Sequence, residues 1–71
     1  MIKVRVQETY KGSGKGGIVT GYLVYAYEGN PLLGEIKNTR QVFRDKDLRK
    51  AKKNADRYAS GLRAMAKQNW L

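Results

Sequence analysis

The sequence predicts an α+β fold in which a three-stranded antiparallel sheet packs against one long C-terminal helix (β-β-β-α). Apolar and polar residues alternate in the first half of the chain, which is the period of a strand. In the second half, apolar residues recur at spacings of three and four, which is the period of a helix. A chain of 71 residues accommodates one small domain, predicted over residues 1–71.

The sheet is predicted over residues 2–37. The first strand covers residues 2–10, where Ile2, Val4 and Val6 alternate with polar residues. A glycine-rich loop at 11–17 follows, and residues 18–27 form a second strand rich in β-branched and aromatic side chains. After a turn at 28–31, the third strand is predicted over 32–37. Residues 38–44 are ambiguous, because Val42 and Phe43 suit either an extension of the sheet or a seal at the helix end.

The helix is predicted over about residues 46–67, with Asp45 as its N-cap. The alanines of its apolar stripe would allow the helix backbone to approach a sheet closely. Trp70 and Leu71 are expected to fold back onto the core, with an exposed anchor as the alternative. The stripe consists of Leu48, Ala51, Ala55, Tyr58, Leu62 and Met65.

The charge is strongly one-sided. The net charge is +9, and residues 38–71 carry ten Lys and Arg against three Asp, which is +7 of that total. A surplus of this kind indicates a polyanionic partner, nucleic acid in the first place. A solvated surface that confers solubility is the alternative. The cations around the helix that we expect to contact nucleic acid are Arg44, Lys46, Arg49, Lys50, Lys53 and Arg57.

The sheet face turned away from the helix is a second candidate. If Val24 and Ala26 face the helix, the other face of the sheet presents aromatic and cationic side chains together. Rings stack on bases and cations contact phosphates, so this combination suits a nucleic acid. The tyrosines could instead lie in the core, or the face could be a dimer interface. The expected contacts are Lys3, Arg5, Tyr25, Tyr27 and Lys37.

Several kinds of chemistry are not expected. The chain has no Cys and no His, so it lacks the usual zinc ligands and the commonest general base. The glycine loop is not a P-loop, because Lys15 is followed by Gly16 and then by a predicted strand. Lys11 and Lys15 could still contact phosphates from a flexible tip. No two carboxylates are placed as an acid–base pair, so we expect no catalysis, metal or cofactor.

Neither a membrane span nor a signal peptide is predicted. The longest apolar run, at 22–27, is too short to cross a bilayer, and residues 1–5 alternate with charges rather than forming an apolar segment. The expected location is the cytoplasm.

Residues 21–62 resemble a known DNA-binding module. An aromatic strand at 21–25 (Gly-Tyr-Leu-Val-Tyr), Phe43 before the helix, and Ala51, Ala55 and Ala59 within it are similar to the AP2-like arm-site-binding domain of tyrosine recombinases. The resemblance implies a sheet placed in the major groove, with Lys3, Arg5, Tyr25, Tyr27 and Lys37 as contacts. The basic run at 50–55 also resembles the start of the last helix of double-stranded-RNA-binding domains.

Together these patterns predict a small basic protein that binds nucleic acid, DNA in preference to RNA, as an accessory or regulatory factor. The alternative is a protein-interaction module, monomeric or homodimeric, that binds an acidic protein.

Overall fold

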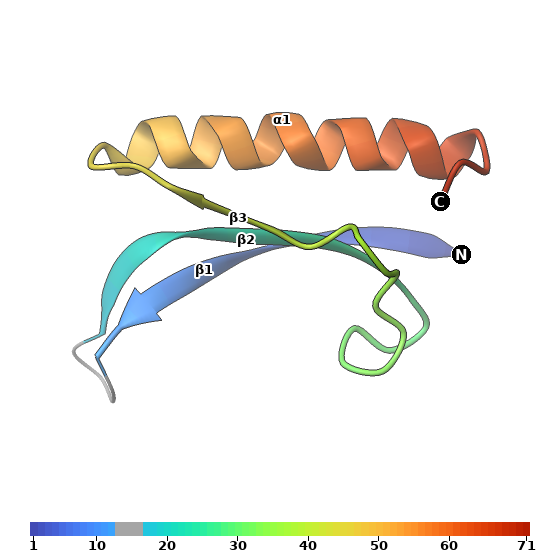
Figure 1. The fold of residues 1–71 in the computed structure, drawn as a ribbon, viewed down its shortest axis with the longest axis horizontal. Coiled ribbons are helices and arrows are strands. Elements are labelled where there is room, and N and C mark those ends of the chain that lie inside the picture. The colour runs from blue at the N-terminus through green and yellow to red at the C-terminus, as the bar shows by residue number, and fades with distance from the viewer. Residues whose placement is uncertain (13–16) are drawn as a thin grey trace.

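The computed structural model describes residues 1–12 and 17–71. It contains strands β1 (Ile2–Lys11), β2 (Ile18–Glu28) and β3 (Gln41–Arg44), followed by helix α1 (Leu48–Lys67) (Figure 1). The strands form one antiparallel sheet in the order β1-β2-β3. The predicted α+β arrangement is confirmed. Part of the predicted glycine loop, residues 13–16 with Lys15, lies outside the described residues.

Strands β1 and β2 form a long hairpin. Their register pairs Ile2 with Glu28 and continues to Lys11 opposite Ile18, with an irregularity between Thr9 and Tyr10. The alternation of apolar residues in β1 therefore maps onto one face of the sheet, as predicted.

The third strand lies later in the chain than predicted. Residues 32–37 form only one isolated bridge, between Tyr27 and Glu35, and β3 begins at Gln41. The physical reason is a turn, in which the amides of Leu33 and Gly34 both donate to the carbonyl of Asn30. This turn uses the backbone groups that a strand over 32–37 would need for pairing.

Thr39 fixes the point at which the chain joins the sheet. Its side-chain oxygen accepts the backbone N–H of Ala26 at 3.0 Å and donates to the carbonyl of Ile36 at 2.7 Å. Its own carbonyl accepts the hydroxyl of Tyr58 at 2.7 Å. One buried threonine, 2% exposed, thus connects β2, the segment before β3 and the helix.

The helix also begins later than predicted. Asp47, rather than Asp45, is the N-cap, and its carboxylate accepts the amide of Arg49 at 3.0 Å. The carboxylate of Asp45, in the link before the helix, accepts the amide of Asp47 at 2.9 Å. At the other end Asn69 adopts a positive φ of 59°, and the amide of Trp70 returns to the carbonyl of Met65. This is a Schellman motif, which ends the helix.

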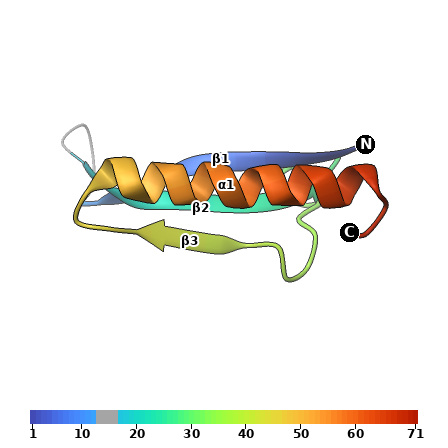
Figure 2. The same ribbon diagram turned by 90° about the horizontal axis from the view of Figure 1, so that it is seen from above.

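The core lies between the sheet and α1. Val24 and Ala26 of β2 pack against Ala55, Ala59 and Leu62, so the predicted facing of the sheet is correct. The predicted apolar stripe is correct in its middle, whereas Met65 at its end is 36% exposed. Figure 2 shows α1 running above β1 and β2, with β3 beside it. Small side chains on both surfaces let the two layers approach closely.

The two apolar residues that follow the helix, Trp70 and Leu71, differ in burial. Leu71 packs against the core, whereas Trp70 is 69% exposed. The predicted fold-back therefore holds for Leu71 and is wrong for Trp70.

Candidate nucleic-acid interface

Two surfaces carry the cations that the sequence singles out. We call the side of the sheet turned away from α1 the sheet face, and the side of α1 turned away from the sheet the outer helix face. The sheet face is built mainly by alternate residues of β1, β2 and β3, and the outer helix face by residues opposite the buried stripe of α1.

The register brings the predicted sheet residues together. Lys3 lies opposite Tyr27, and Arg5 lies opposite Tyr25. Both pairs point away from the core residue Val24. Arg44, opposite Gly21, extends the same face at its far end. The predicted composition of the sheet face is therefore correct in β1 and β2.

Tyr25 is not free to stack on a base. It is only 3% exposed. The guanidinium of Arg40 lies 5.7 Å from the centre of its ring, and the ring of Tyr27 lies at 6.1 Å. The segment between β2 and β3 folds along this side of the sheet (Figure 1). Tyr25 is therefore a covered residue of a small second layer, and its predicted role as a stacking platform is wrong.

Arg40, which was not among the predicted contacts, is paired with an acidic side chain. It makes two hydrogen bonds to Glu35, at 2.9 and 2.7 Å. The bonded guanidinium lowers the pKa of Glu35, so that carboxyl stays negative at neutral pH. No sequence signal links these two residues, because their meeting depends on the turn between β2 and β3.

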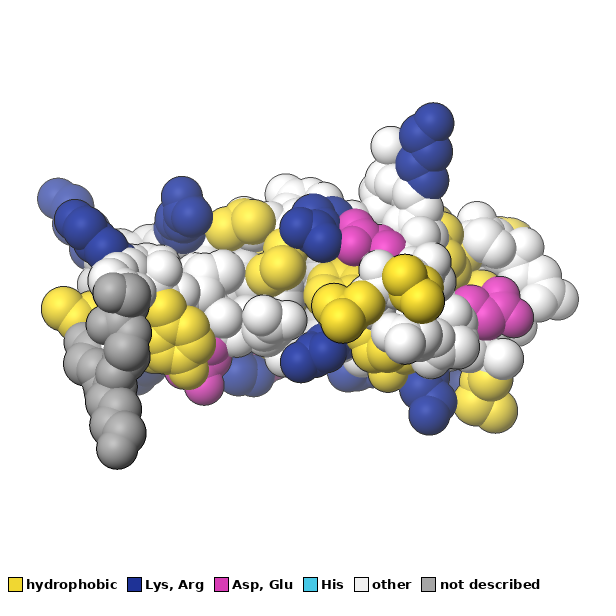
Figure 3. Space-filling view, turned by 90° about the horizontal axis from the view of Figure 1, so that it is seen from below, with side chains coloured by type: hydrophobic (Ala, Val, Ile, Leu, Met, Phe, Trp, Pro, Cys, Tyr) yellow, Lys and Arg dark blue, Asp and Glu magenta, His cyan; other side chains and the backbone are white. Residues whose placement is uncertain are grey.

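The sheet face is chemically mixed. Figure 3 shows its cations separated by hydrophobic side chains, with acidic side chains beside some of them. Leu32 and Leu33, in the segment between β2 and β3, are 85% and 86% exposed. Lys37 is exposed on the same segment. A phosphate backbone would meet few adjacent cations here.

The outer helix face is more uniform. Lys50, Lys53 and Arg57 recur at the helical period and are all exposed, and Lys46 precedes them in the link to β3. Among the described residues these four form no ion pair. Arg49 reaches Asp47 at 3.5 Å from a side chain that is 94% exposed, a weak contact.

The nearest acid on the helix, Asp56, already forms an ion pair with another residue. Asp56 accepts the ammonium of Lys52 at 2.7 Å, and that ammonium also lies 5.9 Å from the ring of Tyr22. Lys52 and Asp56 thus form a pair beside Tyr22 of β2, next to the unpaired cations. The outer helix face keeps its positive charge as a result.

The cations of the outer helix face follow one another at steps of the same order as successive phosphates. A rise of about 1.5 Å per residue separates Lys50, Lys53 and Arg57 by steps of about 4.5 and 6 Å along the axis. Phosphates on one DNA strand follow one another every ~3.4 Å of axis. The helix, with a diameter of about 10–12 Å, also matches a major groove that is ~12 Å wide.

The structure therefore divides the predicted contacts into two groups. Lys3, Arg5, Tyr27 and Arg44 lie on the sheet face, with Lys37 on the adjoining segment and Tyr25 beneath. Lys46, Arg49, Lys50, Lys53 and Arg57 lie on or beside the outer helix face.

In residues 1–12 and 17–71, no group of three or more potential metal-binding side chains comes together. In the same residues, no helix has the length and apolar character needed to cross a membrane.

Comparison of the chain with protein-family models, curated proteins and solved structures finds no match. The resemblance to the arm-site module therefore stays a prediction from the residues quoted for it.

Proposed function

We propose that this protein binds duplex DNA through the outer helix face, as a non-catalytic accessory or regulatory factor of the cytoplasm. One observation carries the proposal: Lys46, Lys50, Lys53 and Arg57 are exposed together, and no described acid pairs with them. Neighbouring like charges destabilise a helix by a few tenths of a kcal/mol each, so their clustering is best explained by a polyanionic partner.

A duplex fits better than a single strand. Proteins that bind single strands combine cations with exposed rings on which bases stack. The outer helix face has no aromatic residue, and on the sheet face Tyr25 is covered and Tyr27 is half-buried.

DNA fits better than RNA. The major groove of B-form DNA is wide enough for a helix, whereas that of A-form RNA is deep and narrow. The contacts available are lysine and arginine contacts to phosphates, which supply affinity without reading the sequence.

The proposal is tested by fluorescence anisotropy with a labelled DNA duplex, the matching RNA duplex and a single strand. Five phosphate contacts predict a slope of about −4.5 in a plot of log K against log salt. The variant K50A/K53A/R57A should bind the DNA duplex at least tenfold more weakly, with a slope smaller by about 2.7.

The matched control is K3A/R5A/K37A, which removes the same charge from the sheet side. It should bind DNA more tightly than the helix variant. Equal losses would mean that only net charge matters. A larger loss in the control would favour the sheet face, as the arm-site resemblance implies. Either result overturns the proposal, as does undetectable binding at about 50 mM salt.

A further inference from the structure

The outer edge of β1 is an unpaired strand edge. The sheet order places β1 at one side, and no described strand pairs with its other edge along Ile2–Lys11. Alternate residues of an edge strand direct their N–H and C=O groups outward, where another strand can pair with them. Ten residues is long for an exposed edge, which natural proteins usually shorten or cover.

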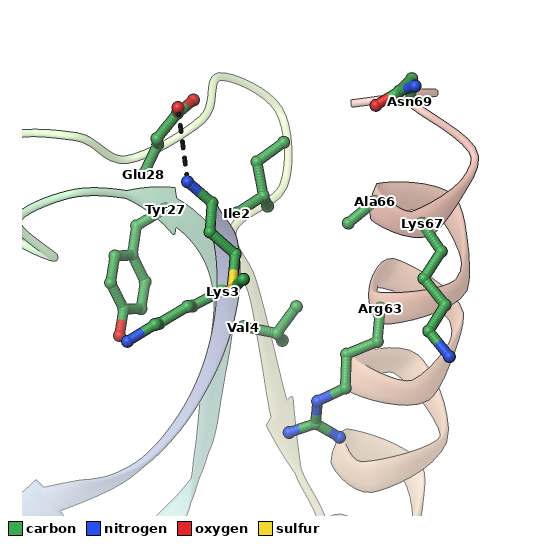
Figure 4. A pocket seen from close by; sticks show the side chains of 10 residues that line it. Ile2, Lys3, Val4, Tyr27, Glu28, Arg63, Ala66, Lys67 and Asn69 are labelled. Atoms are coloured by element: carbon green, nitrogen blue, oxygen red, sulfur yellow. Dashed lines mark ion pairs between the residues drawn. The ribbon is translucent and has the colours of Figure 1, made fainter.

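A groove runs beside this edge, between β1 and the last turns of α1 (Figure 4). Ile2 and Val4, both half-buried, line it from the strand. Ala66 lines it from the helix, together with Arg63 and Lys67. The groove is therefore apolar between its two walls and cationic along its helical rim.

Cations flank the edge on both sides of the sheet. Arg63 and Lys67 are exposed on the helix side, and Lys3 and Arg5 are exposed on the sheet face. None of these four forms an ion pair with a described residue. Glu28 of β2 is the one acid that lines the groove. The charge around the edge therefore favours an acidic occupant.

We propose that β1 binds an extended acidic segment of a partner protein, which adds to the sheet as a fourth strand. Side chains of a paired strand alternate between the two faces in register with β1. Apolar residues of the segment would enter the groove beside Val4. Acidic residues would lie beside Lys3 and Arg5 on the sheet face.

Two other occupants fit this edge less well. A nucleic acid backbone offers acceptors but no row of N–H donors, so it cannot satisfy the outward carbonyls of β1. A second copy would bring Lys3, Arg5 and Lys11 of its own strand against those of the first, in a chain of net charge +9.

The test uses a labelled ten-residue peptide of alternating Val and Glu, titrated into the whole chain. The control peptide has the same composition, with all Val residues preceding all Glu residues, which removes the alternation. We expect the alternating peptide to bind at least tenfold more tightly. Hydrogen exchange should slow at alternate amides of β1 when it binds, since those N–H groups become paired.

Two charge-matched variants separate this surface from the proposed DNA surface. K3E/R5E should weaken binding of the peptide at least tenfold and affect the DNA duplex less than K53E/R57E does. K53E/R57E should weaken duplex binding and largely spare the peptide. Thermal unfolding of both variants verifies that they fold.

The inference is overturned if the two peptides bind equally, if β1 amides gain no protection, or if K53E/R57E weakens the peptide as much as K3E/R5E. No binding of the alternating peptide up to about 1 mM would also overturn it. These outcomes leave the duplex measurements untouched, so the two proposals fail independently.

Discussion

Two glycines differ in whether the fold leaves room for a side chain. Gly21 lies in β2 opposite β3, where an added Cβ would collide with the carbonyl oxygen of Phe43. Gly61 lies mid-helix, where an added Cβ meets no atom within 4 Å. The same residue type is thus required at one position and dispensable at the other.

This contrast predicts opposite effects of the same substitution. G21A should destabilise the protein by about 1–3 kcal/mol, because β2 and β3 must separate to admit the methyl group. G61A should stabilise it by about 0.5–1 kcal/mol, because alanine favours the helix and restricts the unfolded chain. Urea unfolding followed by circular dichroism measures both, and changes of the same sign would contradict the contrast.

The hydrogen bond between Ala26 and Thr39 should contribute to the stability of the protein. In T39V the amide of Ala26 loses its buried acceptor, and we expect a loss of about 1–3 kcal/mol in the free energy of unfolding. T39S keeps the hydroxyl and should lose less. Faster hydrogen exchange at the Ala26 amide in T39V would identify the cause. An unchanged free energy of unfolding in T39V would contradict a contribution of this hydrogen bond to stability.

The ion pair of Arg40 and Glu35 predicts a dependence on pH. The hydrogen bonds from Arg40 lower the pKa of Glu35 in the folded protein, so the pair adds stability above the ordinary pKa of a glutamate. This contribution disappears as the pH falls through the lowered value. Unfolding temperatures at pH 7 and pH 3 should therefore differ less in E35Q than in the natural protein. A difference unchanged by E35Q would contradict this origin.

At the scale of elements, the helix shows how local signals determine its limits. Its apolar stripe and alanine content made its existence predictable, and its C-terminal limit at Lys67 agrees with the sequence pattern. Its start was predicted at about residue 46, but it begins at Leu48. Asp45 and Asp47 are both capable caps, and only the geometry of the link from β3 decides between them.

Two substitutions of the N-cap residue Asp47 should differ in their effect on stability. D47A should destabilise the protein by about 1 kcal/mol, because the amide of Arg49 loses its acceptor. D47N preserves an acceptor of the same shape and should change stability little. Urea unfolding compares the two, and a D47N as unstable as D47A would assign the effect to charge rather than to capping.

The third strand could not be placed from its pattern. Residues 32–37 are apolar enough to resemble a strand, whereas Gln41–Arg44 is short and contains only two apolar residues. Which of the two segments becomes the third strand is decided by pairing with β2. That pairing depends on the turn at Asn30 and on the side chain of Thr39. Thr39 and Ala26 are 13 residues apart, and their contact leaves no periodic signal in the sequence.

For the whole molecule, charge is the dominant feature. Fifteen Lys and Arg face six acids in 71 residues, and mutual repulsion opposes the compact state. At about 0.1 M salt the screening length falls to ~10 Å, so repulsion across the molecule weakens.

This repulsion predicts that salt stabilises the free protein. Raising the salt concentration from about 20 to 200 mM should increase the unfolding temperature, by roughly 4–8 °C for each kcal/mol of relieved repulsion. K50A/K53A/R57A, with three fewer cations, should show a smaller increase. Differential scanning calorimetry measures both, and a decrease with salt would mean that attractive pairs outweigh repulsion.

The sequence by itself determined the fold class, the facing of β2 and the stripe of α1, since periodicity records which side of an element is buried. It also determined the cationic character of the helix. Only the tertiary structure decided which cations remain unpaired and which ring is covered. The residues around Arg40 and Tyr25 in the sequence do not indicate that Arg40 is paired or that Tyr25 is covered. Both outcomes arise because the segment between β2 and β3 brings Glu35 and Arg40 to the sheet face. Contacts between distant residues depend on where the chain folds back, and periodicity does not encode that.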